Sequence, residues 1–131
     1  MDKSIVVMFG NPEFGWVSVD FQYNDIHIDF RASDVLNDPI EELSVAVTEL
    51  KENEVKRVAW WLEPDAYYFD FEQKGQNIQL TILETEDFFD KSVENKKLIT
   101  ITGDTESIIE PFRMALQQFS SWKYAKHNWR Y

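Results

Sequence analysis

Residues 17–30 decide the fold, and they read Val17-Ser18-Val19-Asp20-Phe21-Gln22-Tyr23-Asn24-Asp25-Ile26-His27-Ile28-Asp29-Phe30. Apolar and polar side chains alternate on both sides of Asn24-Asp25, which is the pattern of two half-buried strands joined by a two-residue turn. The predicted apolar pairs are Tyr23 with Ile26, Phe21 with Ile28, and Val19 with Phe30. A single register satisfies both strands, so we expect an antiparallel hairpin.

The polar face of this hairpin brings chemistry-bearing side chains together. Its predicted pairs are Asp20 with Asp29, Gln22 with His27, and Ser18 with Arg31. Two facing carboxylates beside an imidazole can hold a divalent cation or share a proton. Asp20, Asp29 and His27 are therefore a candidate metal site or catalytic site. The alternative is a solvated surface on which Arg31 and His27 offset the repulsion between the carboxylates.

A second hairpin is predicted where aromatic residues alternate with polar ones in residues 67–72. A two-residue turn at Lys74-Gly75 would join this strand to the next one. The pairs expected from that turn are Phe71 with Ile78, Phe69 with Leu80, and Tyr67 with Ile82.

Two helices are predicted beside these strands. Asp38-Pro39 has the form of an N-cap followed by proline at the first helical position, and the helix should run to about Glu52, with Glu42 facing water. A closing helix either begins near Glu110 or is kinked at Pro111. Between them, residues 84–97 are mostly charged, and we expect a loop there with Phe88-Phe89 as its apolar anchor.

These elements predict one α+β domain spanning residues 1–131. We expect an antiparallel sheet of about six strands, built from hairpins, with two helices packed on one face. There is no internal repeat and no Pro, Gly or Ser-rich linker that would mark a domain boundary.

Composition excludes several classes of function. The chain has 131 residues, no cysteine and a net charge of −11 at pH 7. The negative charge disfavours nucleic acid and anionic membranes as partners, and favours a basic protein partner. Isolated glycines, two histidines and no cysteine provide neither a phosphate-binding loop nor a zinc cluster of standard spacing, so no cofactor is expected. The lack of cysteine and of a signal peptide predicts a cytoplasmic protein.

Aromatic doublets mark a candidate binding surface. Alternation sends Trp60 and Tyr67 to the core, so Trp61 and Tyr68 should lie on the opposite face, near Arg57. Exposed Trp, Tyr and Arg side chains are the types that anchor protein interfaces, and Asp70 and Glu72 stand beside them. The alternative is that the C-terminal segment covers this face. That segment interleaves aromatic and basic residues, and we expect it to pack back on the domain rather than contact a partner.

Two stretches carry a family resemblance: Ser33-Asp34-Val35-Leu36-Asn37-Asp38-Pro39-Ile40-Glu41-Glu42-Leu43 and Trp61-Leu62-Glu63-Pro64-Asp65-Ala66-Tyr67. With their layout over residues 15–82, they resemble small uncharacterised bacterial proteins, some of which are similar to immunity proteins found beside secreted polymorphic toxins. The resemblance implies binding of a cognate toxin by surface complementarity, without catalysis and without a cofactor.

The sequence thus favours a non-catalytic, acidic protein-binding domain, with an immunity protein as the specific form. Its candidate contact residues are Trp61, Tyr68, Asp70, Glu72 and Arg57. One alternative is a carboxylate-based metal-binding protein or enzyme that uses Asp20, Asp29 and His27. Another is a structural or adaptor subunit that forms a homo-oligomer through its aromatic face. Both a monomer and a homodimer are compatible with the sequence.

Overall fold

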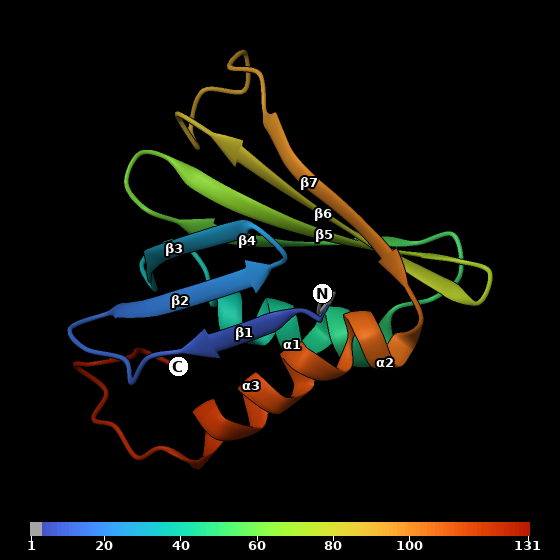
Figure 1. Cartoon of the computed structure of the whole chain (residues 1–131). Coiled ribbons are helices and arrows are strands. Elements are labelled where there is room, and N and C mark those ends of the chain that lie inside the picture. The colour runs from blue at the N-terminus through green and yellow to red at the C-terminus, as the bar shows by residue number, and fades with distance from the viewer. Residues whose placement is uncertain (1–3) are drawn as a thin grey trace.

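The computed structural model describes residues 4–131 as an α+β arrangement of two antiparallel sheets and three helices (Figure 1). The first sheet has the order β1-β2-β3, and its strands are β1 (Val6–Phe9), β2 (Trp16–Tyr23) and β3 (Ile26–Ser33). The second sheet has the order β4-β5-β6-β7, and its strands are β4 (Val55–Trp61), β5 (Ala66–Lys74), β6 (Asn77–Thr85) and β7 (Lys96–Gly103). The helices are α1 (Pro39–Glu49), α2 (Thr105–Ile108) and α3 (Glu110–Ser121).

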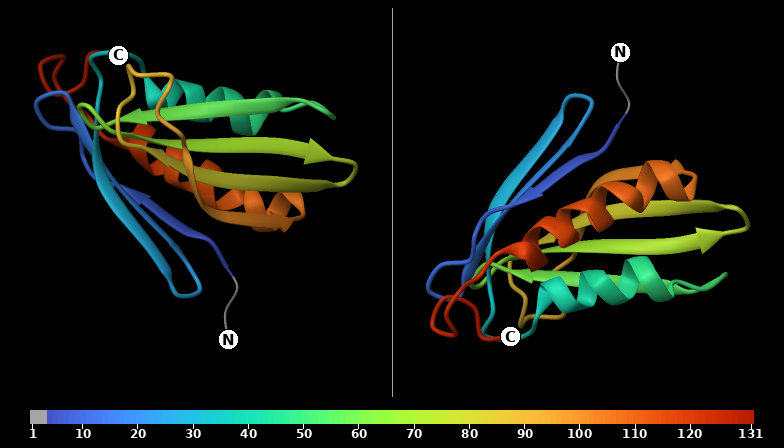
Figure 2. Two further views of the ribbon diagram at one scale, coloured as in Figure 1. Left: turned by 90° about the horizontal axis from the view of Figure 1, so that it is seen from above. Right: turned by 90° about the horizontal axis from the view of Figure 1, so that it is seen from below.

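The prediction of a single six-stranded sheet is wrong, because β3 and β4 contact each other without pairing. The chain between them forms α1, so no hairpin brings their edges together. Figure 2 shows the three-stranded sheet crossing one end of the four-stranded sheet, while α1 and α3 cover one face of the latter. We call the opposite face of the four-stranded sheet the outer face.

The first hairpin has the predicted register. Val19 pairs with Phe30 and Phe21 with Ile28, and all four side chains are at most 9% exposed. The alternation therefore places one face of this hairpin in the core and leaves Asp20 and Asp29 opposite each other on the other face, also as predicted.

The second hairpin is shifted by two residues from the prediction. Its turn is formed by Gly75 and Gln76, where Gly75 adopts a φ of +65°, and Lys74 pairs with Asn77. Phe71 consequently faces Leu80 rather than Ile78. Because side chains alternate with a period of two, an even shift exchanges partners and leaves every inward side chain inward. The observed pairs for the other two positions are Phe69 with Ile82 and Tyr67 with Glu84.

Helix α1 begins as predicted, because an Asp38 carboxylate oxygen accepts hydrogen bonds from the backbone N–H groups of Ile40 and Glu41 at 3.1 and 3.2 Å. The helix ends at Glu49, earlier than expected. The closing helix, α3, begins at Glu110, which is the first of the two predicted alternatives, and a separate short helix precedes it. Helix α2 is a single turn capped by Asp104, and α3 follows directly after Ile109, with proline in its first turn.

Glu42 does not face water as predicted, but ties α1 to the free edge of β4. Its carboxylate accepts a hydrogen bond from the backbone N–H of Ala59 at 2.9 Å. Asn37 donates through its amide nitrogen to the same carboxylate at 2.9 Å and to the Ala59 carbonyl at 2.8 Å. These contacts occupy polar backbone groups that an edge strand would otherwise leave open for pairing with another chain.

One hydrophobic core joins both sheets and the helices. The centre of the Phe69 ring lies 5.8 Å from the ring centre of Phe21 in the other sheet and 6.1 Å from that of Phe112 in α3. Trp60 is fully buried, and it lies 5.8 Å from Phe30. Within residues 4–131, no helix is both long and apolar enough to cross a membrane.

Candidate functional site

The outer face carries the charged residues that the sequence indicated. Arg57 and Asp70 are paired across β4 and β5, and two guanidinium nitrogens donate to the carboxylate at 2.8 and 2.9 Å. The guanidinium carbon also lies 4.3 Å from the centre of the Tyr68 ring. Hydrogen bonding to Asp70 raises the pKa of Arg57. Asp70 is thus neutralised within the domain, whereas the one ion pair of Glu72 within residues 4–131 is with Lys74, at 3.9 Å.

Trp61 and Tyr68 lie on the predicted face, but they are covered. Their exposed fractions are 7% and 6%, so the expectation that they are exposed anchors is wrong. Phe88 contacts both rings, at 6.5 Å from Trp61 and 6.3 Å from Tyr68. The cover therefore comes from residues 86–95, which we call the acidic loop, and not from the C-terminal segment.

The acidic loop is held in place by specific bonds. The Phe88 N–H donates to the carbonyl of Pro64 at 2.7 Å, which ties the loop to the β4–β5 turn. The Phe89 N–H donates to the side chain of Asp87 at 2.9 Å. Asp90 accepts from the hydroxyl and the N–H of Ser92 at 2.6 and 3.0 Å, and these bonds lower the pKa of its carboxyl group. The loop thus presents its side chains from a defined backbone.

Phe89 is the residue that sequence reasoning missed. The Phe88-Phe89 doublet was expected to anchor the loop, and Phe88 does so. The centre of the Phe89 ring lies 5.6 Å from the centre of the Trp61 ring, with the two rings nearly perpendicular, yet Phe89 remains 61% exposed. The acidic loop that carries Phe89 also carries four carboxylates and one amine, from Glu86, Asp87, Asp90, Glu94 and Lys91. The signal available in the sequence was an aromatic residue, Phe89, within a run of mostly charged residues.

The second candidate site lies on the β2–β3 hairpin, on the face that points away from the core. Ligand atoms of Asp20, His27 and Asp29 all lie within 4.8 Å of one another. His27 Nε2 is 3.0 Å from an Asp20 carboxylate oxygen, and Gln22 donates to the other oxygen at 3.1 Å. These hydrogen bonds, chiefly the one with His27, lower the pKa of Asp20, and the same contact raises the pKa of His27. The predicted cluster therefore does form.

The C-terminal segment, residues 122–131, packs back on the domain as predicted. Trp129 is 1% exposed and lies 6.2 Å from Phe119. The N–H of Arg130 donates to the buried carboxylate of Asp34 at 2.7 Å. The N–H of Gly15 donates to the Asn128 carbonyl at 2.7 Å. The segment therefore joins the β1–β2 loop. Trp129 is buried and Trp122 and Tyr124 are half-buried, whereas the basic residues of the segment are exposed.

The two candidate sites suit different ligands. The acidic loop offers an exposed ring among carboxylates, which suits a protein surface of opposite charge. The hairpin cluster offers nitrogen and oxygen ligands for a metal ion. No known protein family, curated protein or solved structure matches the chain.

Proposed function

We propose that the chain is a non-catalytic protein-binding domain whose acidic loop and adjoining outer face bind a basic protein partner. In its specific form, the proposal is an immunity protein that blocks a basic toxin. The observation that carries it is Phe89, a 61% exposed aromatic ring on a structured loop that also carries four carboxylates. Interfaces of this kind place an aromatic residue at the centre and charges at the rim.

The loop carboxylates are available to a partner. No ion pair formed within residues 4–131 involves Glu86, Asp87, Asp90 or Glu94. The ammonium of Lys91 lies 5.0 Å from the Phe88 ring. With four carboxylates against one amine, the loop therefore adds a net negative field, which accelerates the approach of a cationic surface and is weakened by salt.

Affinity capture from native lysate tests the proposal when the wild-type chain is compared with two matched variants. Phe89→Ala removes the central ring, whereas Phe14→Ala removes a ring that is 70% exposed elsewhere on the molecule. We expect a basic protein that is retained by the wild type and by Phe14→Ala, lost by Phe89→Ala, and released by moderate salt. Equal capture by all three chains, or no basic protein at all, would contradict the proposal.

The charge contribution is tested separately by association kinetics with the captured partner. Glu86→Gln together with Glu94→Gln should lower the on-rate and flatten its dependence on salt, because both carboxylates lie in the loop. These positions are better than Asp70, since replacing Asp70 would leave Arg57 unpaired. An unchanged on-rate would remove the loop carboxylates from the mechanism.

A second candidate function, binding of a divalent cation, is favoured by the ligand atoms of Asp20, His27 and Asp29. A metal ion bound there would replace the proton between His27 Nε2 and the Asp20 oxygen, which lie 3.0 Å apart. Calorimetry with Mg²⁺, Mn²⁺ and Ca²⁺ should give a heat of binding that Asp20→Asn abolishes. No heat with the wild-type chain would exclude this candidate for those ions.

A further inference from the structure

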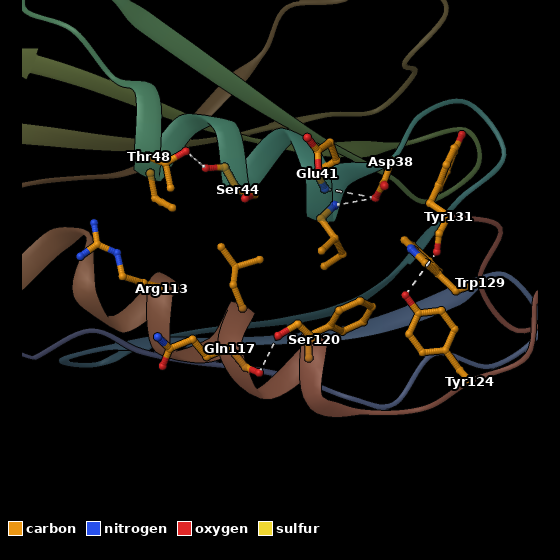
Figure 3. Close-up of a pocket in the computed structure, with 14 residues that line it drawn as sticks. Asp38, Glu41, Ser44, Thr48, Arg113, Gln117, Ser120, Tyr124, Trp129 and Tyr131 are labelled. Carbon is orange, nitrogen blue, oxygen red and sulfur yellow. Dashed lines mark hydrogen bonds between the residues drawn. The ribbon is translucent and has the colours of Figure 1, made fainter.

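A groove of about 500 Å³ lies between α1 and α3 (Figure 3). The groove runs along α1 from Glu41 to Thr48, and these residues span roughly 10 Å at the rise of an α-helix. Tyr124 and Trp129 of the C-terminal segment close one end, and Arg113 lies near the other (Figure 3). A volume of this size is typical of pockets that hold small molecules, which commonly measure roughly 300–1,000 Å³.

The groove has an apolar interior and a polar rim. Ile40, Val47 and Leu116 contribute aliphatic side chains from both helices. Ser44 and Gln117 belong to its polar lining, and Figure 3 shows them on facing helices. A ligand in this groove would bury an apolar body between the helices and keep a polar end near water.

Charge distinguishes the two ends of the groove. Asp38 and Glu41 lie at the end closed by the C-terminal segment, and neither takes part in an ion pair within residues 4–131. At the other end, Arg113 is already paired with Glu110. The N-terminus of α1 and the C-terminus of α3 meet at the closed end (Figure 3), so their helix dipoles oppose each other there. Asp38 accepts two backbone hydrogen bonds as the N-cap of α1, so Glu41 is the carboxylate that carries uncompensated charge at this end.

An aromatic ring completes the acidic end. Tyr124 and Asp38 both line the groove; burial raises the pKa of the Tyr124 hydroxyl, and the negative charge of Asp38 raises it further. Burial also raises the pKa of Asp38; the hydrogen bonds from the N–H groups of Glu41 and Ile40 act in the opposite direction, and repulsion by Glu41 makes a smaller contribution to the rise. A cation at this end would relieve that repulsion and could contact the face of the Tyr124 ring.

We propose that the α1–α3 groove binds a small organic ammonium ion, with its cationic head beside Asp38 and Glu41 and its apolar body against Leu116 and Val47. The groove lies on the helical side of the four-stranded sheet, opposite the outer face (Figure 2). This proposal is independent of the protein-binding function, and each can fail without the other.

Three probes of equal chain length test the head-group requirement: hexylammonium, hexanoate and 1-hexanol. Amide chemical shifts of the ¹⁵N-labelled chain report both the affinity and the location of binding. We expect hexylammonium to bind with a dissociation constant of about 1 mM, which is ordinary for a ligand of this size, and to shift amides of α1, α3 and the C-terminal segment. Equal binding of hexanoate, or shifts elsewhere, would overturn the proposal.

A matched pair of variants on α1 tests the position of the cationic head. Glu41→Gln removes a carboxylate of the groove, and Glu49→Gln removes an exposed one from the same helix outside it. We expect Glu41→Gln to weaken hexylammonium binding about three- to fivefold, as for a partly exposed ion pair, and Glu49→Gln to leave it unchanged. An equal effect of the two variants would show that the overall charge, rather than the groove, attracts the cation.

Discussion

Replacing Trp129 with alanine should strongly destabilise the domain, although this residue lies two positions from the last one. The indole is 1% exposed, and it packs within the core against Phe119 at 6.2 Å. Removing a fully buried Trp side chain costs about 3–5 kcal/mol of unfolding free energy, because burial is lost and a cavity remains. In a chain of this length the melting temperature should fall by roughly 10–20 °C.

Urea unfolding followed by circular dichroism measures this change. The urea concentration at the midpoint should fall while the m-value stays constant, because unfolding exposes nearly the same surface area in both chains. Tyr131→Ala is the control, because that ring is 45% exposed, and it should change the stability by less than about 1 kcal/mol. A loss below about 1 kcal/mol for Trp129→Ala would refute the conclusion that the C-terminal segment belongs to the core.

Three further predictions concern single contacts. Gly15→Ala should destabilise the chain by about 1–3 kcal/mol in urea unfolding, because the residue has a φ of +81° and its new Cβ would lie 2.9 Å from Asp34. Glu42→Ala should cost about 1–3 kcal/mol in the same assay, since it leaves a backbone N–H of β4 unpaired. Asp20→Asn should lower the pKa of His27 toward its ordinary value in an NMR titration. The stabilisation from the Asp20–His27 contact should be full below the unfolded-state pKa of His27, and it should be lost as the pH rises through the raised folded-state pKa.

The first hairpin was predictable because its pattern and its turn agree. Asn24-Asp25 and the alternation on both sides admit one register that buries Val19, Phe21 and their partners. The cluster of Asp20, Asp29 and His27 followed from that register without further assumptions. The local sequence was therefore sufficient to predict a cluster whose residues all belong to one pair of strands.

The second hairpin shows where local pattern is insufficient. A shift of two residues preserves which side chains point inward, so alternation alone does not separate Ile78 from Leu80 as the partner of Phe71. The turn decides the register, and Gly75 takes the first turn position with a positive φ. The choice between Lys74-Gly75 and Gly75-Gln76 as the turn therefore required the structure.

The candidate contact surface was only partly predictable, because burial on the outer face depends on a loop. Alternation correctly placed Trp61 and Tyr68 on the face of the sheet opposite to that of Trp60, but it contains no information on which segment covers them. Residues 86–95 fold over these rings through Phe88, which transfers the exposed aromatic position to Phe89. Contacts between segments distant in the chain determine such exposure, and periodicity within one strand does not encode them.

The most direct test of the proposed binding surface is hydrogen–deuterium exchange of the full chain, free and in complex with a basic protein partner obtained by capture. Binding through the acidic loop should slow exchange in residues 86–95 and in neighbouring parts of β4 and β5. Exchange in α1 and α3 should stay unchanged, because these helices lie on the other side of the sheet (Figure 2). Protection confined to the helices, with none in the acidic loop, would contradict the proposed surface.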